Sequence, residues 1–142
     1  MTALDTNVLI GIMVSSSSLH KEATKGLSNL SDELCTTPTN VGETLRLLTH
    51  PKVFSSPLKT SEAITAFSEF CESYSMRILD EDPSWWTQLR EMEKLIPGLK
   101  GNEIFDARIA ICLKQHGVKR IFTFDSDFNK YPFLQPLRLR TE

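Results

Sequence analysis

Four acidic residues stand where strands are predicted to end or helices to begin, and together they could hold a metal ion. Asp5 closes the short apolar stretch TALD, and Asp125 follows the apolar stretch RIFTF. Glu43 and Asp106 lie in the first turns of two predicted helices. If the strands are neighbours in a parallel sheet, these positions meet at its carboxyl edge. Bare carboxylates there would repel one another, whereas a hard cation such as Mg²⁺ or Mn²⁺ takes oxygen ligands of this kind.

Each acid also has an ordinary structural explanation. Asp5 could cap the helix after it, and Glu43 stands three residues after Asn40, as in a capping box. Asp106 could complement the dipole of its helix, and either acid of the segment DSD (125–127) could close a turn. None of these explanations accounts for acids from four separate segments at one predicted edge.

No histidine or cysteine competes for a role in this chemistry. The three histidines fall away from the predicted edge, at helix ends or on the surface: His20, His50 and His116. The three cysteines lie in or beside apolar stretches without metal-site spacing: Cys35, Cys71 and Cys112. We interpret them as reduced thiols of a cytoplasmic protein. The chemistry at the predicted edge of the sheet is therefore expected to depend on the acids and a bound cation.

Alternating apolar strands and amphipathic helices must position these acids. Strands are predicted over residues 2–5, 33–38, 76–80, 120–124 and 137–140. Helices are predicted over residues 7–14, 20–30, 39–50, 60–75, 84–96 and 102–117. Thr6 or Asn7 is expected to cap the first helix, and Asp82 with Pro83 to start the fifth. The alternation predicts an α/β fold with a mostly parallel central sheet.

Composition fits one globular domain over residues 1–142. Hydrophobic residues make up 40% of the chain and charged residues 24%, and the net charge is −2. That balance argues against a strongly basic nucleic-acid binder, but the remainder of the chain is net positive once the four acids hold cations. Six basic side chains could form a phosphate-binding rim or simply be solvated: Arg46, Lys52, Arg108, Lys119, Arg120 and Lys130. No apolar run approaches the length of a membrane span.

Four segments taken in order resemble the PIN-domain ribonucleases, and specifically the VapC-type toxins. They are LDTNVLI, ETLRLLTHPKVF, GNEIFDARIA and TFDSDF, and they extend over nearly the whole chain. The resemblance implies a three-layer α/β/α sandwich with four to five strands. It implies one or two Mg²⁺ or Mn²⁺ ions held by four acids, with a fifth acid able to join them: Asp5, Glu43, Asp106, Asp125 and, as the fifth, Asp127. It also implies that Asn7 and Thr123 orient the acids, whereas the family varies at Asn102 and Glu103.

The activity implied by this resemblance is metal-dependent cleavage of RNA by an endoribonuclease. Two metal ions can activate water and stabilise the leaving oxygen of a phosphodiester. Arg46 and Arg108 are the expected contacts to the substrate, which could be transfer or ribosomal RNA. The implied partners are a VapB-type antitoxin and a second copy of the chain. Apolar side chains that could serve such contacts, or simply pack in the core, are Val53, Phe54, Trp85 and Trp86.

Three alternatives stay open at this point. The chain could be a PIN nuclease that processes RNA rather than a toxin. It could be a non-catalytic RNA-binding module, although all four acids are present. The segment RIFTFDSDF also resembles the acidic motif of haloacid-dehalogenase-like phosphatases, which normally comes first in the chain rather than near its end.

Overall fold

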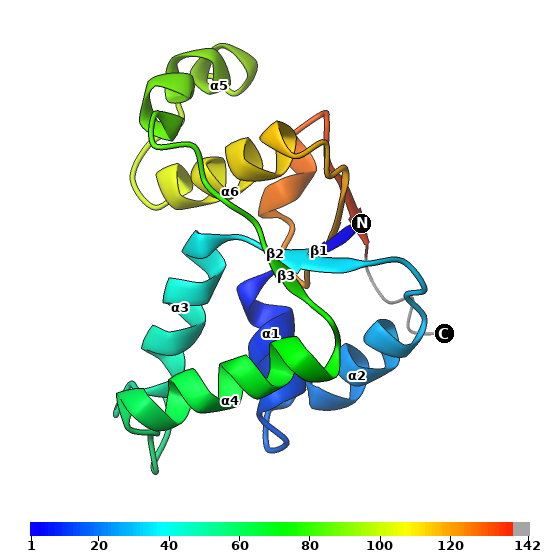
Figure 1. Cartoon of the computed structure of the whole chain (residues 1–142). Coiled ribbons are helices and arrows are strands. Elements are labelled where there is room, and N and C mark those ends of the chain that lie inside the picture. The colour runs from blue at the N-terminus through cyan, green and yellow to red at the C-terminus, as the bar shows by residue number, and fades with distance from the viewer. Residues whose placement is uncertain (138–142) are drawn as a thin grey trace.

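Five short parallel strands form the centre of the molecule, in the order β3-β2-β1-β4-β5. The computed structural model describes residues 1–137. The strands are β1 (Thr2–Leu4), β2 (Leu34–Thr36), β3 (Arg77–Ile78), β4 (Arg120–Phe122) and β5 (Gln135–Leu137). Because β1 lies in the middle and pairs with both β2 and β4, its carboxyl end is surrounded by neighbouring strand ends (Figure 1).

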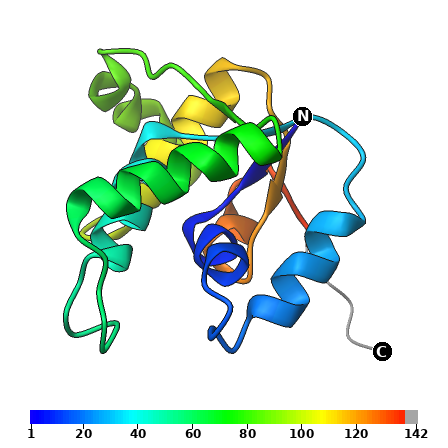
Figure 2. The same ribbon diagram turned by 60° about the horizontal axis from the view of Figure 1, so that its bottom comes forward.

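Helices cover both faces of this sheet, as Figures 1 and 2 show. They are α1 (Thr6–Met13), α2 (His20–Ser28), α3 (Pro38–Leu48), α4 (Thr60–Ser73), α5 (Leu89–Leu95) and α6 (Glu103–Gln115). Alternate strand residues point to opposite faces. Ala3 belongs to a core that α5 and α6 complete, and Leu4 to a core that α1, α2 and α4 complete. The expected three-layer α/β fold is confirmed, with all the observed strand pairs parallel.

Two helices begin earlier than predicted because a different residue caps them. Asp5, rather than Thr6 or Asn7, is the N-cap of α1, and its carboxylate accepts a hydrogen bond from the Thr6 amide at 2.8 Å. Thr37 is the N-cap of α3, so Pro38 opens that helix instead of ending the strand before it. Proline suits the first helical position because the amide missing there would have no helical partner.

Two predicted elements differ at their ends. The helix expected over residues 84–96 begins as a 3₁₀ helix, Trp85–Gln88, before α5. Asp82 does not start a regular helix, because its carboxylate accepts from the amide and the hydroxyl of Ser84 in a local turn. The last strand begins at Gln135, two residues before its predicted start at Leu137, and residues 138–140 of the predicted strand lie outside the described range. Within residues 1–137, no helix has the length and apolar character needed to cross a bilayer.

Gly26 and Gly42 allow a matched test of the packing of α2 against the sheet. A Cβ on Gly26 would overlap the ring of Phe122, whereas a Cβ on Gly42 would meet nothing within 4 Å. We therefore expect Gly26→Ala to lower the free energy of unfolding by about 1–3 kcal/mol. Gly42→Ala should raise it by roughly 0.5–1 kcal/mol, the usual gain inside a helix. Urea unfolding followed by circular dichroism measures both, and equal stability of Gly26→Ala and wild type would contradict this packing.

Candidate active site

The acids predicted to converge do lie around one cleft at the carboxyl edge of the sheet. Asp5 follows β1 directly and is only 7% exposed. Glu43, Asp106 and Asp127 line a cleft of about 730 Å³ between α3 and α6. The charge of Asp125 acts on both Asp5 and Asp106, which places it in the same cluster. Glu43 lies in the second turn of α3 rather than in the first, because that helix begins at Pro38.

Three donors hold the carboxylate of Asp5. The amide of Thr6 and the side-chain amide of Asn40 donate to Oδ1, at 2.8 and 3.1 Å. The hydroxyl of Thr123 donates to Oδ2 at 2.7 Å. The capping explanation and the site explanation for Asp5 are therefore compatible, since one oxygen caps α1 while the whole carboxylate is held in a fixed orientation close to Glu43 and Asp125.

Asn7 and Thr123 link the start of α1 to the segment after β4. The side-chain amide of Asn7 donates to the Thr123 hydroxyl at 3.4 Å, and its carbonyl oxygen accepts from the Phe124 amide at 3.3 Å. The Thr123 hydroxyl also accepts from the Asp125 amide at 3.0 Å. Thr123 therefore contacts Asp5 directly, and both residues contact the backbone at or beside Asp125.

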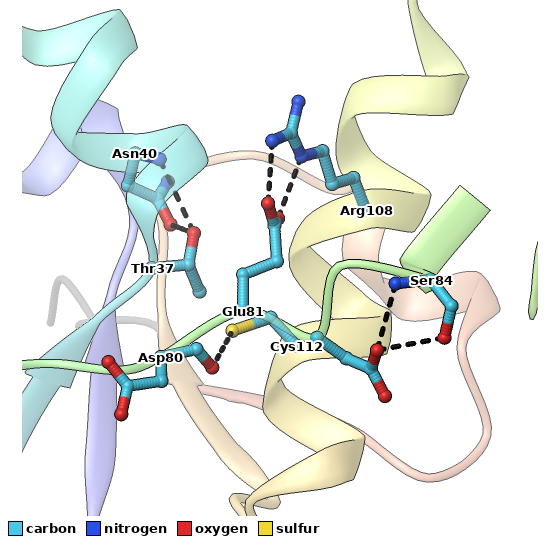
Figure 3. A network of polar contacts seen from close by, with 8 residues as sticks. Thr37, Asn40, Asp80, Glu81, Ser84, Arg108 and Cys112 are labelled. Atoms are coloured by element: carbon cyan, nitrogen blue, oxygen red, sulfur yellow. Dashed lines mark hydrogen bonds and ion pairs between the residues drawn. The ribbon is translucent and has the colours of Figure 1, made fainter.

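Sequence reasoning missed the part played by Asn40 and Thr6. Asn40 was considered only as a cap, but its amide donates to Thr6 Oγ1 at 3.0 Å as well as to Asp5. Thr6 in turn donates to Glu43 Oε2 at 2.8 Å, so the capping box proposed for Glu43 is wrong. The Thr37 hydroxyl donates to the side-chain oxygen Oδ1 of Asn40 at 2.7 Å and so fixes the orientation of the Asn40 side-chain amide (Figure 3). A buried asparagine on the inward stripe of a helix is the signal that could have revealed it.

The cluster carries more negative charge than its surroundings neutralise. Burial, and after it the charges of Asp5, Asp127, Asp125 and Glu43, together raise the pKa of Asp106 from its ordinary value near 3.8 to about 7. Burial also raises the pKa of Asp5, against the opposing effect of its hydrogen bonds. Such a set of oxygen donors fits a divalent cation, which would restore the charged forms.

The carboxylates are gathered but are not closed around an ion. Across residues 1–137, no three acidic, histidine or cysteine side chains already stand in the arrangement of a finished metal site. The acids come from four segments, which are the residues after β1 and β4, the second turn of α3 and the first turn of α6. Asp127 lies exposed at the rim. Its pKa is raised by partial desolvation and by the charge of Asp125.

Comparison with known proteins identifies the family to which this architecture belongs. A family model described as PIN domain matches residues 2–134. The chain belongs to the PIN domain family. Ribonuclease VapC48 from Mycobacterium tuberculosis is 28% identical over 87 residues, which cover 61% of this chain and 59% of that protein. The family assignment replaces the phosphatase alternative drawn from RIFTFDSDF.

Solved structures share the fold of this PIN domain. VapC20 from Mycobacterium tuberculosis, described as a Sarcin-Ricin loop cleaving toxin, has a TM-score of 0.74 at 17% identity and covers 98% of this chain and 100% of its own. VapBC2 from Rickettsia felis, bound to a DNA fragment from its promoter, has a TM-score of 0.66 at 16% identity, with 96% of each chain covered. At these identities the likeness shows the fold.

Two arginines of the PIN domain line the cleft beside the acids. Arg46 of α3 is exposed there. Arg108 of α6 donates from Nε and Nη2 to the carboxylate of Glu81, at 2.7 and 2.6 Å, and its guanidinium lies 4.2 Å from the centre of the Trp85 ring. Figure 3 shows Glu81 reaching Arg108 from the segment after β3. Arg108 is therefore held rigidly at the cleft wall rather than being free in solvent.

The predicted basic rim is wrong at two positions. Arg120 is the first residue of β4, at the opposite edge of the sheet, where it pairs with Asp32 at 3.4 Å. Lys119 precedes it, and its carbonyl accepts from the Gln135 amide. Lys130 is near the acids but pairs with Glu103 at 3.2 Å. The rule that places carboxyl ends of strands together also places their first residues on the far edge, and this excludes Lys119 and Arg120.

The remaining candidates lie outside the cleft. Each histidine ring contacts nearby backbone: His20 the Gly11 carbonyl, His50 the Lys52 amide and His116 the Asp80 carbonyl. Cys35 and Cys112 are buried free thiols, and burial raises the pKa of Cys35 to about 12. Of the apolar candidates, Val53 and Trp86 are exposed, and Phe54 and Trp85 are half-buried. Lys52 is exposed in the loop after α3.

The raised pKa of Asp106 predicts how stability depends on pH without a cation. Between pH 4 and 7 the folded chain keeps a proton that the unfolded chain has released, so the free energy of unfolding falls as pH rises through this window. Asp106→Asn removes the titrating group. In EDTA, the stability of this variant relative to wild type should therefore rise from pH 4 to pH 8, as measured by urea unfolding.

Asp82→Asn is the matched control for this measurement. Hydrogen bonds from Ser84 hold the pKa of Asp82 below its usual value. The stability of Asp82→Asn relative to wild type should therefore not rise between pH 4 and pH 8. Parallel pH profiles of stability for wild type and Asp106→Asn would contradict the raised pKa of Asp106.

Proposed function

We propose that this PIN domain is a metal-dependent endoribonuclease that hydrolyses RNA phosphodiester bonds. The observation that carries the proposal is the position of Asp106. Asp106 lines an open cleft together with Glu43, Asp127, Arg46 and Arg108. Burial and the charges of four neighbouring acids raise its pKa to about 7. The similarity to Ribonuclease VapC48 supports the same activity.

Asp5, Glu43, Asp106 and Asp125 would hold one or two Mg²⁺ or Mn²⁺ ions, with Asp127 as a further ligand at the rim. When bound, the cation supplies water activation and stabilises charge that develops on the phosphate. The part of the chain that the structure describes offers no histidine or cysteine within the cleft lining for that task.

The surrounding residues of the chain would position these acids and the substrate. Asn40 and Thr123 fix the orientation of Asp5, and Thr6 fixes that of Glu43. Arg46 and Arg108 would attract the phosphates of the RNA, because guanidinium groups match phosphate geometry. Glu81 keeps Arg108 from folding onto the acids, since both of its carboxylate oxygens accept from that guanidinium.

The biological role proposed for this nuclease is that of a toxin restrained by a small VapB-type antitoxin. Similar solved structures are described as a toxin–antitoxin complex from Klebsiella pneumoniae and as VapBC-1 from nontypeable Haemophilus influenzae. A homodimer in the cytoplasm is part of the same proposal. The RNA-processing role and the non-catalytic module remain the alternatives that the assay below separates.

Cleavage of total RNA by the purified chain tests the proposed activity. We expect cleavage with Mn²⁺ or Mg²⁺, none in EDTA, and loss to background in Asp5→Asn, because that change removes one ligand and disturbs the donors around it. Products are resolved on denaturing gels, and 5′-phosphate ends are detected by end-dependent ligation.

Glu69→Gln, an exposed acid on α4, is the matched control and should cleave as wild type does. Cleavage that survives EDTA or Asp5→Asn would contradict the proposed chemistry. RNA binding without cleavage would support the non-catalytic module. Suppression of cleavage by the product of a short reading frame beside the gene would support the toxin role over RNA processing.

A further inference from the structure

One aromatic side chain stands exposed in the cleft, next to the acid cluster. Phe105 belongs to α6, immediately before Asp106, and is 52% exposed. Asn102, three residues earlier, and Arg108, three residues later, line the same cleft, so they share one face of the helix. Phe105 therefore presents an apolar ring within a wall that is otherwise polar and charged.

This exposure is unusual for α6, whose other face is packed. Its apolar side chains are almost completely buried over most of the helix: Ala107, Ile109, Ala110, Ile111, Cys112 and Leu113. The ring of Phe105 therefore does not contribute to the packing of the core. A large apolar group left in water beside functional polar groups is typical of a ligand-binding surface.

The opposite wall of the cleft leaves room for a flat ligand. Gly42 of α3 lines it, and a Cβ at that position would meet nothing within 4 Å. Arg46 follows one turn later on the same helix, and Arg108 lies on the Phe105 side. Thr39, also in this wall, has a hydroxyl without a hydrogen-bond partner among the described residues. The cleft therefore combines an aromatic surface, open space and two cations.

We propose that Phe105 stacks on an unpaired base of the RNA and so positions the adjacent phosphate over the acids. Bases of single-stranded RNA stack on aromatic side chains, whereas paired bases in a helix are not free to do so. Arg46 and Arg108 would contact the flanking phosphates. The inference rests on the proposed function for the identity of its ligand, and it makes Phe105 a substrate-positioning residue rather than a catalytic one.

Trp86 offers a matched control. It is 60% exposed, in the 3₁₀ helix before α5, but it does not line the cleft. If the loss of any exposed aromatic side chain weakened RNA binding, Trp86→Ala would weaken it as well. Phe105→Leu keeps an apolar side chain without a ring, and Phe105→Trp keeps a ring, so this pair separates stacking from general apolar contact.

The test measures binding of a short single-stranded RNA that carries one 2-aminopurine, with Ca²⁺ in place of Mg²⁺. Anisotropy gives the affinity, and 2-aminopurine fluorescence reports stacking. We expect Phe105→Ala and Phe105→Leu to weaken affinity about tenfold and to lose the fluorescence change. Phe105→Trp and Trp86→Ala should bind as wild type does. A duplex of the same sequence should bind wild type and Phe105→Ala equally.

Equal affinity of wild type and Phe105→Ala for the single strand would overturn the inference. An equal loss of affinity of Phe105→Ala for the duplex would overturn it as well. A change confined to self-association, measured by sedimentation, would also overturn it and would assign Phe105 to a protein interface. If cleavage fails but the stacking signal persists, the proposed hydrolysis is wrong and this inference stands. If cleavage occurs and Phe105→Ala binds normally, the nuclease stands and the inference fails. If no RNA binds, both are overturned.

Discussion

The carboxylate of Asp5, buried at the end of the central strand, is the constraint on which the rest of the site depends. A buried carboxylate is costly unless several donors reach it. Here a helix amide, an asparagine side chain and a threonine hydroxyl do so, and they come from α1, α3 and the segment after β4. Satisfying one carboxylate therefore fixes three separate elements relative to one another.

That same arrangement brings further acids close to Asp5. Asn40 donates to the Thr6 hydroxyl, which in turn donates to Glu43. The Thr123 hydroxyl accepts from the Asp125 amide and so positions that part of the backbone. These groups satisfy hydrogen bonds but do not supply positive charge. Arg108, a half-buried cation of the cleft wall, is already paired with Glu81. Burial and the charges of the neighbouring acids therefore raise the pKa of Asp106. A bound divalent cation is the neutralising group that the proposal requires.

The sequence allowed the acids to be placed, and the resemblance pointed to Asn7 and Thr123 as supports, but Asn40, Thr6 and Glu81 were missed. Asp5 and Asp125 could be located because each follows an apolar strand, and Asp106 because it lies in the first turn of a long apolar helix. Asn40 was not placed, since its partners Asp5 and Thr6 belong to a distant segment of the chain. The pairing of Arg108 with Glu81 was also hidden, because it joins α6 to an irregular segment that no periodicity describes. Arg120 was wrongly assigned to the rim. It is the first residue of its predicted strand, so the direction of that strand already places it at the edge opposite the acids.

Binding of Mn²⁺ to the purified chain, followed by electron paramagnetic resonance, tests the central claim that these acids share a divalent cation. The account predicts saturable binding at pH 8 that Mg²⁺ displaces and that Asp5→Asn abolishes. Asn40→Ala, which removes a support but no ligand, should weaken the affinity by roughly 10- to 100-fold. Glu69→Gln should bind as wild type does. Absence of Mn²⁺ binding by wild type, or equal binding by wild type and Asp5→Asn, would contradict the account.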